Sequence, residues 1–331
     1  MTVALPVLAR ELTPSVTECR RSRTDLYVKT LLDRTSRSLH SGDLSTIDAF
    51  ADALDQVRLD AGAAEWSRLI SDLIAPHPIA TQLRAEPFTR RAFEKPRGYA
   101  GDAVMMDMVY RDRPYDVTLT RLGAALHAWV DRRPAAASVL ERRKILATEI
   151  DAAAGRREAP RILSIACGHL REAQESVAVH ARAISELVAL DQDAESLAIV
   201  DREQGAFNVR VHRASVRRFV RRGQELGEFD FVYSAGLYDY LDEASAKSVT
   251  EAMFRSLRPG GRMLIGNFAP ELRDIGFMEA VMDWRLIYRD EAALLQVANG
   301  LPSDEVAACS TTRDRPGNVV YMTIDRTGIA Q

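Results

Sequence analysis

The chain has 331 residues, of which 47% are hydrophobic and 27% are charged, so it is long enough for one large globular domain or about two smaller ones. Its 44 Lys and Arg residues nearly balance its 47 Asp and Glu residues, which leaves a formal net charge of −3. This balance creates no strong electrostatic field. We therefore expect neither a nucleic acid nor a membrane surface as a partner.

The cysteines and the opening residues indicate a compartment. Cys19, Cys167 and Cys309 are odd in number and far apart, which fits neither a disulfide framework nor a thiolate metal site. The first residues contain an apolar stretch broken by Pro6 and lack the basic start of a secretory signal. No uncharged apolar run approaches the roughly 18 residues of a membrane span. We expect a cytoplasmic protein.

The first half of the sequence is typical of helices. Between Asp25 and Asp151 the apolar residues recur at helical spacing, as in Trp66, Leu69 and Leu73. Prolines and glycine-containing turns interrupt this pattern at intervals. The pattern predicts about six to eight helices, most of them short.

The second half has a different pattern, which begins after a polar linker at residues 154–160. Short apolar runs alternate there with helical stretches, which indicates βαβ units in a mostly parallel sheet covered by helices on both faces. The runs span residues 161–166, 186–190, 208–212, 229–234, 262–266 and 319–323. We therefore expect a helical domain over 1–155 and an α/β domain over 156–331.

The loop after the first run is the first candidate for ligand binding, because such sheets bind ligands at the carboxyl ends of their strands. It reads Ala166-Cys167-Gly168-His169-Leu170, and its small residues allow a ligand to approach the backbone. A helix after this loop would point its N-terminal amides at the ligand. Only one glycine of the Gly-x-Gly-x-x-Gly pattern is present, which is weak support for a dinucleotide site.

Asp191 is a stronger signal, because it ends the second run about 20 residues after Gly168. A carboxylate at this position can accept hydrogen bonds from both hydroxyls of a ribose. The alternative is a solvated aspartate at a strand end or a helix N-cap. Ser215, after the third run, is equally suited to bond an adenine edge or to cap the helix expected over 216–222.

These features occur in an order that resembles class I S-adenosylmethionine-dependent methyltransferases. After the small-residue loop and the strand-end acid come the strand at 229–234 and, at 257–265, a helix end with Pro-Gly-Gly before another strand. Residues 95–106, 234–241 and 266–289 are similar to the subgroup of extracellular-factor 3-hydroxypalmitate methyl ester biosynthesis proteins. The resemblance covers roughly residues 90–325.

The first motif departs from the superfamily pattern at Ser164, Ala166 and Leu170, where an acid or glycine and then two glycines are usual. Ser215 stands where an acid is common after the third strand. These departures leave open how the methionine end of the cofactor lies.

The resemblance implies an α/β fold, namely a Rossmann-like class I methyltransferase sheet over 156–331 that binds S-adenosyl-L-methionine. It also implies that the N-terminal all-helical domain acts as a lid and substrate domain. The expected cofactor-binding residues are Arg97, Tyr99, Ala166, Gly168, His169, Asp191, Gln192, Ser215, Val216, Ser234, Ala235 and Gly236.

Arg97 and Tyr99 lie in a glycine-containing segment between helices, which indicates a loop that folds over the cofactor. Arg97 suits the cofactor's carboxylate through a charge-assisted fork, and Tyr99 could face the sulfonium. The alternative is that Tyr99 packs between the domains and Arg97 pairs with Asp102.

Three residues are the candidates for catalysis, namely Tyr99, Tyr238 and Asn267. Residues 238–240 follow the fourth strand, where such folds place substrate-facing groups, and we expect one of the three to point inward. Asn267 follows the fifth strand. Trp284 and Tyr288, expected four apart on one helix, are more typical of core residues.

The sequence allows two roles for His169. It could be a general base, or it could stay neutral in the first turn of a helix beside Glu172. The histidines show no metal-ligand spacing, so no metal is expected.

The leading hypothesis is methyl transfer to a small molecule of secondary metabolism, most simply a carboxylate or another O or N nucleophile. A second hypothesis is cyclisation of S-adenosylmethionine, as the only substrate, to azetidine-2-carboxylate with loss of methylthioadenosine. A third is a non-catalytic sensor that binds the cofactor. The sequence leaves a homodimer open.

Overall fold

The computed structural model describes residues 16–110 and 119–328. Within these ranges the N-terminal half folds into eight α-helices, in agreement with the periodicity. They are α1 (Val16–His40), α2 (Ile47–Ala61), α3 (Ala63–Leu69), α4 (Pro78–Leu83), α5 (Pro87–Glu94), α6 (Ala103–Tyr110), α7 (Arg121–Val130) and α8 (Pro134–Arg156), with a π-helical turn η1 (Ile70–Ile74) after α3. Because α8 continues to Arg156, the linker expected from residue 154 is shorter than predicted.

The helix starts follow from local chemistry. Pro78, Pro87 and Pro134 each occupy the first turn of a helix, where a missing N–H costs nothing. The buried carboxylate of Glu86 accepts hydrogen bonds from the first free N–H groups of α5. These stops and starts divide the helical half into short segments.

The second half forms a seven-stranded sheet with strand order β3-β2-β1-β4-β5-β7-β6. The first five strands are parallel, and β7 is antiparallel to both β5 and β6. The strands are β1 (Arg161–Ile165), β2 (Glu186–Asp191), β3 (Val209–Arg213), β4 (Phe229–Ser234), β5 (Leu257–Phe268), β6 (Val306–Arg313) and β7 (Val319–Arg326). The connecting elements are η2 (Arg171–Gln174), α9 (Val177–His180), α10 (Ala194–Gln204), η3 (Gly205–Phe207), α11 (Val216–Arg222), η4 (Gly223–Leu226), η5 (Tyr238–Tyr240), α12 (Glu243–Arg255), α13 (Ile275–Val281) and α14 (Glu291–Gln296).

Two features of the sheet differ from the sequence analysis. The edge strand β6 was not predicted, because its residues are mostly exposed and small or polar. The segment Pro259-Gly260-Gly261 was expected to stop a helix, but it lies inside β5, since α12 has already ended at Arg255. The parallel core of the sheet agrees with the prediction.

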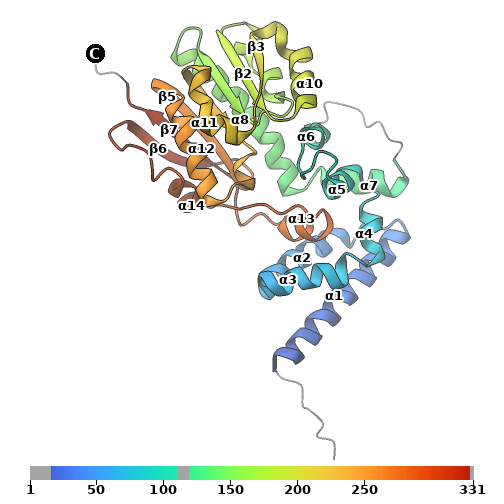
Figure 1. Cartoon of the computed structure of the whole chain (residues 1–331). Helices are drawn as coiled ribbons and strands as arrows, with labels where there is room; N and C mark the ends of the chain where they lie inside the picture. The colour runs from blue at the N-terminus through green and yellow to red at the C-terminus, as the bar shows by residue number, and fades with distance from the viewer. Residues whose placement is uncertain (1–15, 111–118, 329–331) are drawn as a thin grey trace, which may run out of the picture.

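Helices cover both faces of the sheet (Figure 1), and the strand residues alternate between them. Ile162 packs in one core cluster with residues of α8, α9 and α10, whereas its neighbour Leu163 packs in a second cluster with α11, α12 and α14. Helix α8 belongs to the helical half by sequence. It nevertheless supplies part of one layer of the sheet domain.

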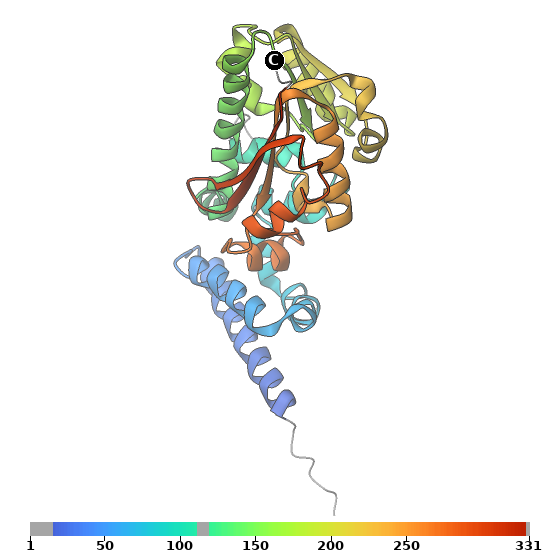
Figure 2. The same cartoon turned by 90° about the vertical axis from the view of Figure 1, so that its left-hand side faces the viewer.

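Helix α13 is one of the elements through which the N-terminal helices contact the rest of the molecule. The N–H of Gly276 donates to Asp55 (3.2 Å), and the indole N–H of Trp66 donates to Glu279 (2.7 Å). Figure 2 shows α1 to α3 beyond one end of the sheet, with α13 beside them. Residues 283–290 after α13 form no regular structure, so the expectation that Trp284 and Tyr288 share a helix is wrong.

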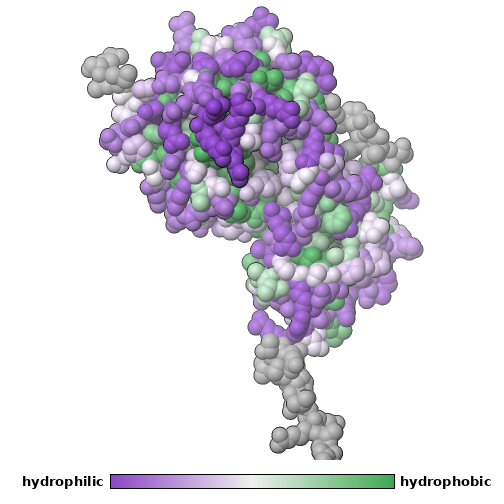
Figure 3. All heavy atoms as spheres, viewed as in Figure 1, coloured by the Kyte–Doolittle hydropathy of each residue, from purple (hydrophilic) through white to green (hydrophobic). Residues whose placement is uncertain are grey.

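The surface seen in Figure 3 is mainly hydrophilic, and its hydrophobic residues are scattered. None of the helices in the described ranges combines the length and the apolar character that crossing a bilayer requires.

Candidate functional site

A cavity of about 490 Å³ lies at the carboxyl ends of β1, β2 and β4, a size suited to a nucleoside-sized ligand. The segment at 95–102, α6 and α8 close it from the helical half. Its lining includes Arg97, Tyr99, Met106, Asp107, Tyr110 and Arg142 from that half, and Ala166, Gly168, His169, Asp191, Gln192, Val216, Ala235, Gly236, Asp239 and Tyr240 from the sheet domain.

The turn after β1 brings the backbone close to α6. Ala166, Gly168 and Leu170 all have positive φ angles (55°, 54° and 52°). A Cβ atom on Gly168 would lie 3.2 Å from the Cβ of Ala103, so only glycine fits without displacing α6. The α-helix expected directly after this loop is absent, and the short 3₁₀-helix η2 follows instead.

Asp191 lies where the sequence predicts, at the end of β2 and in the cavity wall. One carboxylate oxygen accepts the N–H of Gly168 (2.9 Å), and the other accepts the N–H of Asp193 (2.9 Å). Burial raises the pKa of Asp191. Each oxygen keeps a lone pair, so the carboxylate is held rigidly and can still accept two hydroxyls. These residues fit the ribose of a nucleoside.

His169 lines the cavity from a buried ion-pair cluster. Its Nδ1 lies 2.8 Å from Asp107, whose carboxylate also accepts two hydrogen bonds from Arg171 (both 2.7 Å). Burial acts to raise the pKa of Asp107, but the hydrogen bonds from Arg171 and His169 outweigh it and lower the pKa to about 2. Nε2 of His169 is buried, and no group in the described part of the chain forms a hydrogen bond with it.

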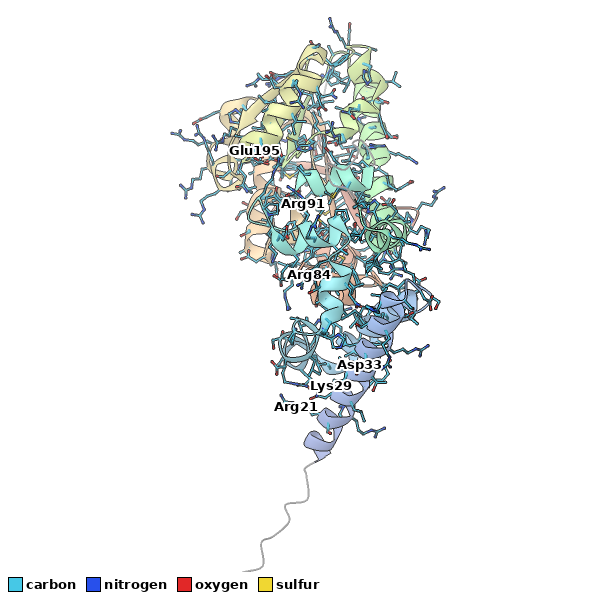
Figure 4. The ribbon with its side chains drawn as sticks, turned by 90° about the vertical axis from the view of Figure 1, so that its right-hand side faces the viewer. Arg21, Lys29, Asp33, Arg84, Arg91 and Glu195 are labelled. Carbon is cyan, nitrogen blue, oxygen red and sulfur yellow. The ribbon has the colours of Figure 1, made fainter. Side chains whose placement is uncertain are left out.

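Arg97 and Tyr99 both reach the cavity wall, but Arg97 has partners other than those expected. Its guanidinium donates to Asp193 (2.6 Å), Ser196 (2.8 Å) and Glu195 (3.1 Å), and so ties the segment at 95–102 to α10. The alternative partner, Asp102, is held by Arg91 instead. Figure 4 labels Glu195 on α10 and Arg91 on α5. Arg97 is therefore committed to an ion pair.

Tyr99 packs edge-to-face on Tyr240, with ring centroids 6.3 Å apart. Burial, with a contribution from nearby Asp191, raises its pKa to about 12, so the phenol stays neutral. The hydroxyl of Tyr240 accepts from the indole of Trp284 (2.9 Å) and donates to the carbonyl of Ala100 (2.6 Å). Trp284, expected in the core, is buried and also lines the cavity.

Two of the expected cofactor-binding residues, Ser215 and Ser234, do not line the cavity. Ser215 caps α11, because its hydroxyl accepts the N–H of Arg218 (3.3 Å), so the capping alternative is correct. The hydroxyl of Ser234 donates to the carbonyl of Ile165 (2.9 Å) and joins β4 to β1.

Tyr238, expected to be catalytic, does not line the cavity either, so this expectation is wrong. This side chain is fully buried under α12, with its hydroxyl 2.8 Å from Thr250. It packs in the core, whereas the next two residues reach the cavity.

Asp239 is the residue after β4 that carries a charge into the cavity. Its Oδ1 accepts the amide of Asn267 (3.0 Å) and the N–H of Phe268 (2.8 Å). Arg289 donates to the side-chain oxygen of Asn267 (2.8 Å). Asn267 therefore touches Asp239 and not the main cavity, so we reassign it from a catalytic to a positioning residue. Burial raises the pKa of Asp239 to about 6, although the Phe268 N–H and two nearby arginines act against this.

Sequence reasoning missed Arg142, which lies on α8 in the cavity wall. Its guanidinium donates to the carbonyl of Ala235 (2.9 Å) and to the hydroxyl of Tyr110 (3.0 Å). No carboxylate in the described ranges pairs with it. The signal was present, because Arg142 falls at helical spacing between the buried residues Val139 and Leu146. An arginine on the apolar face of a helix is expected to be buried and to bind a buried partner or ligand.

Within the described ranges no group of His, Cys, Asp or Glu side chains is arranged to hold a metal ion.

Comparisons with known proteins give one family match and several similar structures. Residues 162–261 match a family of methyltransferase domains. No curated protein matches the sequence of the chain. A possible exported protein from Bordetella parapertussis has a similar fold, with a TM-score of 0.60 and 16% identity over 96% of this chain and 100% of that one.

Two methyltransferases crystallised with S-adenosylhomocysteine share less of the structure. Magnesium protoporphyrin IX methyltransferase from Synechocystis PCC 6803 has a TM-score of 0.46 and 12% identity, covering 67% of this chain and 92% of that one. An N-methyltransferase from Bradyrhizobium japonicum WM9 has a TM-score of 0.43 and 13% identity, covering 67% and 97%. The family match includes the Gly168 turn and Asp191. The comparison therefore identifies residues 162–261 as similar to a methyltransferase domain.

Proposed function

We propose that the protein transfers a methyl group from S-adenosylmethionine to a small molecule through a carboxylate or another oxygen or nitrogen nucleophile. The observation that carries this proposal is the buried carboxylate of Asp191, hydrogen-bonded to the Gly168 turn in the wall of a cavity within the methyltransferase domain. The cofactor supplies a methyl carbon already activated by its sulfonium. Position and exclusion of water therefore matter more than acid or base strength.

The residues of the cavity divide this work among them. Asp191 would hold the ribose, and the Gly168 turn leaves room for the chain that links it to the sulfur. Arg142, which has no carboxylate partner in the described ranges, would hold the cofactor's carboxylate in place of Arg97. Tyr99, Tyr240 and Trp284 would give the sulfonium aromatic neighbours and exclude water.

The test is to incubate the purified protein with S-adenosylmethionine alone and then with a panel of small carboxylic acids, alcohols and amines. We expect S-adenosylhomocysteine only when an acceptor is added. Methylthioadenosine formed without an acceptor would contradict methyl transfer and favour cyclisation to azetidine-2-carboxylate. Binding of the cofactor with neither product across the panel would favour a sensor. The role in secondary metabolism, the cytoplasmic location and a homodimer stay predictions.

A further inference from the structure

Asp239 has one carboxylate oxygen that receives no hydrogen bond within the described ranges. Among the other carboxylates of the cavity, Asp191 uses both oxygens for backbone N–H groups, whereas Glu172 also uses only one, which accepts the hydroxyl of Tyr233 (2.7 Å). Asp239 uses only Oδ1, and in the described ranges nothing donates to Oδ2. Oδ2 is not among the fully buried polar atoms that lack a hydrogen bond, so it keeps some exposed surface although the residue as a whole is only 4% exposed. Because Asp239 lines the cavity, Oδ2 is the oxygen that faces it.

The surroundings hold this carboxylate in one orientation. Asn267 and the N–H of Phe268 grip Oδ1, and Arg289 fixes Asn267 through hydrogen bonds to its side-chain oxygen and to the carbonyl of Tyr238 (both 2.8 Å). A carboxylate that is held in one orientation and has one free oxygen can accept a proton or a hydrogen bond from an N–H group of a ligand.

The place of Asp239 in the fold indicates which ligand this is. The ribose site lies at the end of β2, and the Gly168 turn follows β1, which is next to β4 in the sheet. A nucleoside that binds Asp191 and extends past this turn directs its far end toward β4. Asp239 follows β4 and stands beyond that end, near the aromatic residues Tyr240 and Trp284.

We propose that Oδ2 of Asp239 binds the protonated amine of the methyl acceptor and takes the proton that this nitrogen loses on methylation. This inference rests on the proposed function and narrows the acceptor to an amine, because a carboxylate would bring a second negative charge to a buried aspartate. In the step, the ammonium first loses a proton to Oδ2, and the electron pair of the broken N–H bond becomes the nitrogen lone pair. The nitrogen lone pair forms the N–C bond to the methyl carbon, the C–S bond breaks, and the sulfur keeps the electron pair.

The experiment compares two nucleosides by calorimetry: S-adenosylhomocysteine and sinefungin, in which an ammonium-bearing carbon replaces the sulfur. The ammonium of sinefungin stands where the transferable methyl would be, within reach of a base placed for the acceptor. We expect wild-type protein to bind sinefungin about tenfold or more tightly than S-adenosylhomocysteine at pH 7.5. In Asp239→Asn this ratio should fall to about one, with the affinity for S-adenosylhomocysteine nearly unchanged. The exposed control Asp304→Asn should keep the wild-type ratio.

The pH dependence of the wild-type ratio gives a second measurement that needs no variant. The charged and titratable groups around Asp239 are Arg142, Arg289, Tyr240, Tyr288 and Tyr321. Because the tyrosine pKa values are raised and arginine stays charged, only Asp239 changes charge among them near neutral pH. The ratio should therefore fall as the pH is lowered through about 6, where Asp239 takes up a proton.

The outcomes separate this inference from the proposed function. A ratio that Asp239→Asn leaves unchanged, or a wild-type ratio that is flat with pH, would overturn the role of Asp239 even if both nucleosides bind. If wild-type protein binds neither nucleoside, the proposed function fails instead.

Discussion

Asp191 is the residue on which the cofactor site depends most directly. We expect Asp191→Ala to weaken binding of S-adenosylhomocysteine by about 1–3 kcal/mol, because two ribose hydroxyls would lose a charged acceptor. Asp191→Asn preserves the shape of the side chain, so its affinity for S-adenosylhomocysteine should lie between those of the wild-type protein and Asp191→Ala. Titration calorimetry measures the change, and Asp201→Ala, exposed on the adjacent α10, serves as the control. Unchanged affinity in a folded Asp191→Ala protein would remove this residue from the site.

Arg142 provides a separate test of how the methionine end is held. Wild-type protein should bind S-adenosylmethionine more tightly than its decarboxylated analogue by about 1.5–3 kcal/mol, the range for a hydrogen bond to a charged group. Arg142→Met should bind the two compounds equally. Arg255→Met, on the half-exposed end of α12, should keep the wild-type preference. A preference that survives in Arg142→Met would assign the carboxylate to another residue.

The sequence predicts some of these residues and not others for physical reasons. Gly168 and Asp191 follow from the regular spacing of a βαβ unit. Arg142 does not, because it reaches the site from a helix outside that unit. The residues after β4 show a further difficulty. Residues 238–240 form a 3₁₀-helix, in which each residue turns by about a third of a circle, so alternation does not tell which side chain faces the cavity.

At the scale of elements, the segment at 95–102 is fixed to the sheet domain at Gly101. This glycine has a φ of +76°, and an added Cβ would lie 2.6 Å from the hydroxyl of Tyr240 and 2.7 Å from the ring of Trp284. Gly98 has a similar φ of +87° but nothing within 4 Å of an added Cβ. The two positions therefore separate backbone strain from crowding.

We expect both Gly98→Ala and Gly101→Ala to lose about 1–2 kcal/mol in free energy of unfolding from the left-handed backbone. Gly101→Ala should lose about 1–3 kcal/mol more, because its methyl group crowds a packed site. It should also weaken binding of S-adenosylhomocysteine, since Tyr240 and Trp284 line the cavity. Urea denaturation and calorimetry test this, and equal behaviour of the two variants would show that the contact at Gly101 is not required.

Elements were predicted well where their pattern was strong. The parallel strands β1, β2 and β4 are mostly buried, and their positions agree with the sequence analysis to within one residue, as does that of the more exposed β3. The edge strand β6 was not predicted, because most of its side chains face solvent. Residues 283–290 have helical spacing but an irregular backbone, held by contacts such as the N–H of Ile287 to the carbonyl of Asp239 (2.7 Å). Tertiary contacts override local preference there.

At the scale of the whole molecule, a close contact between α13 and α2 is one of those that join the N-terminal helices to the rest. An added Cβ on Gly276 would lie 2.5 Å from the backbone nitrogen of Asp55, so α13 and α2 pack backbone to backbone. Gly276→Ala should cost about 1–3 kcal/mol in free energy of unfolding and speed proteolysis of the N-terminal helices.

Gly155→Ala is the matched control for this substitution. It also lies in a helix, but an added Cβ there has nothing within 4 Å, so its effect should stay within about 1 kcal/mol of zero and tend to stabilise. If the two alanine variants unfold at the same urea concentration, the close approach at Gly276 does not hold the N-terminal helices.

The dependence of α2 on α13 also bears on how the protein is made. The hydrogen bond from Gly276 to Asp55 joins residues 221 positions apart, and many other residues of the N-terminal helices belong to the same continuous core as α13. During synthesis, α1 to α3 leave the ribosome long before their partner exists. The face of α2 that packs on α13 therefore stays uncovered until most of the chain has been translated, so this contact forms late in folding.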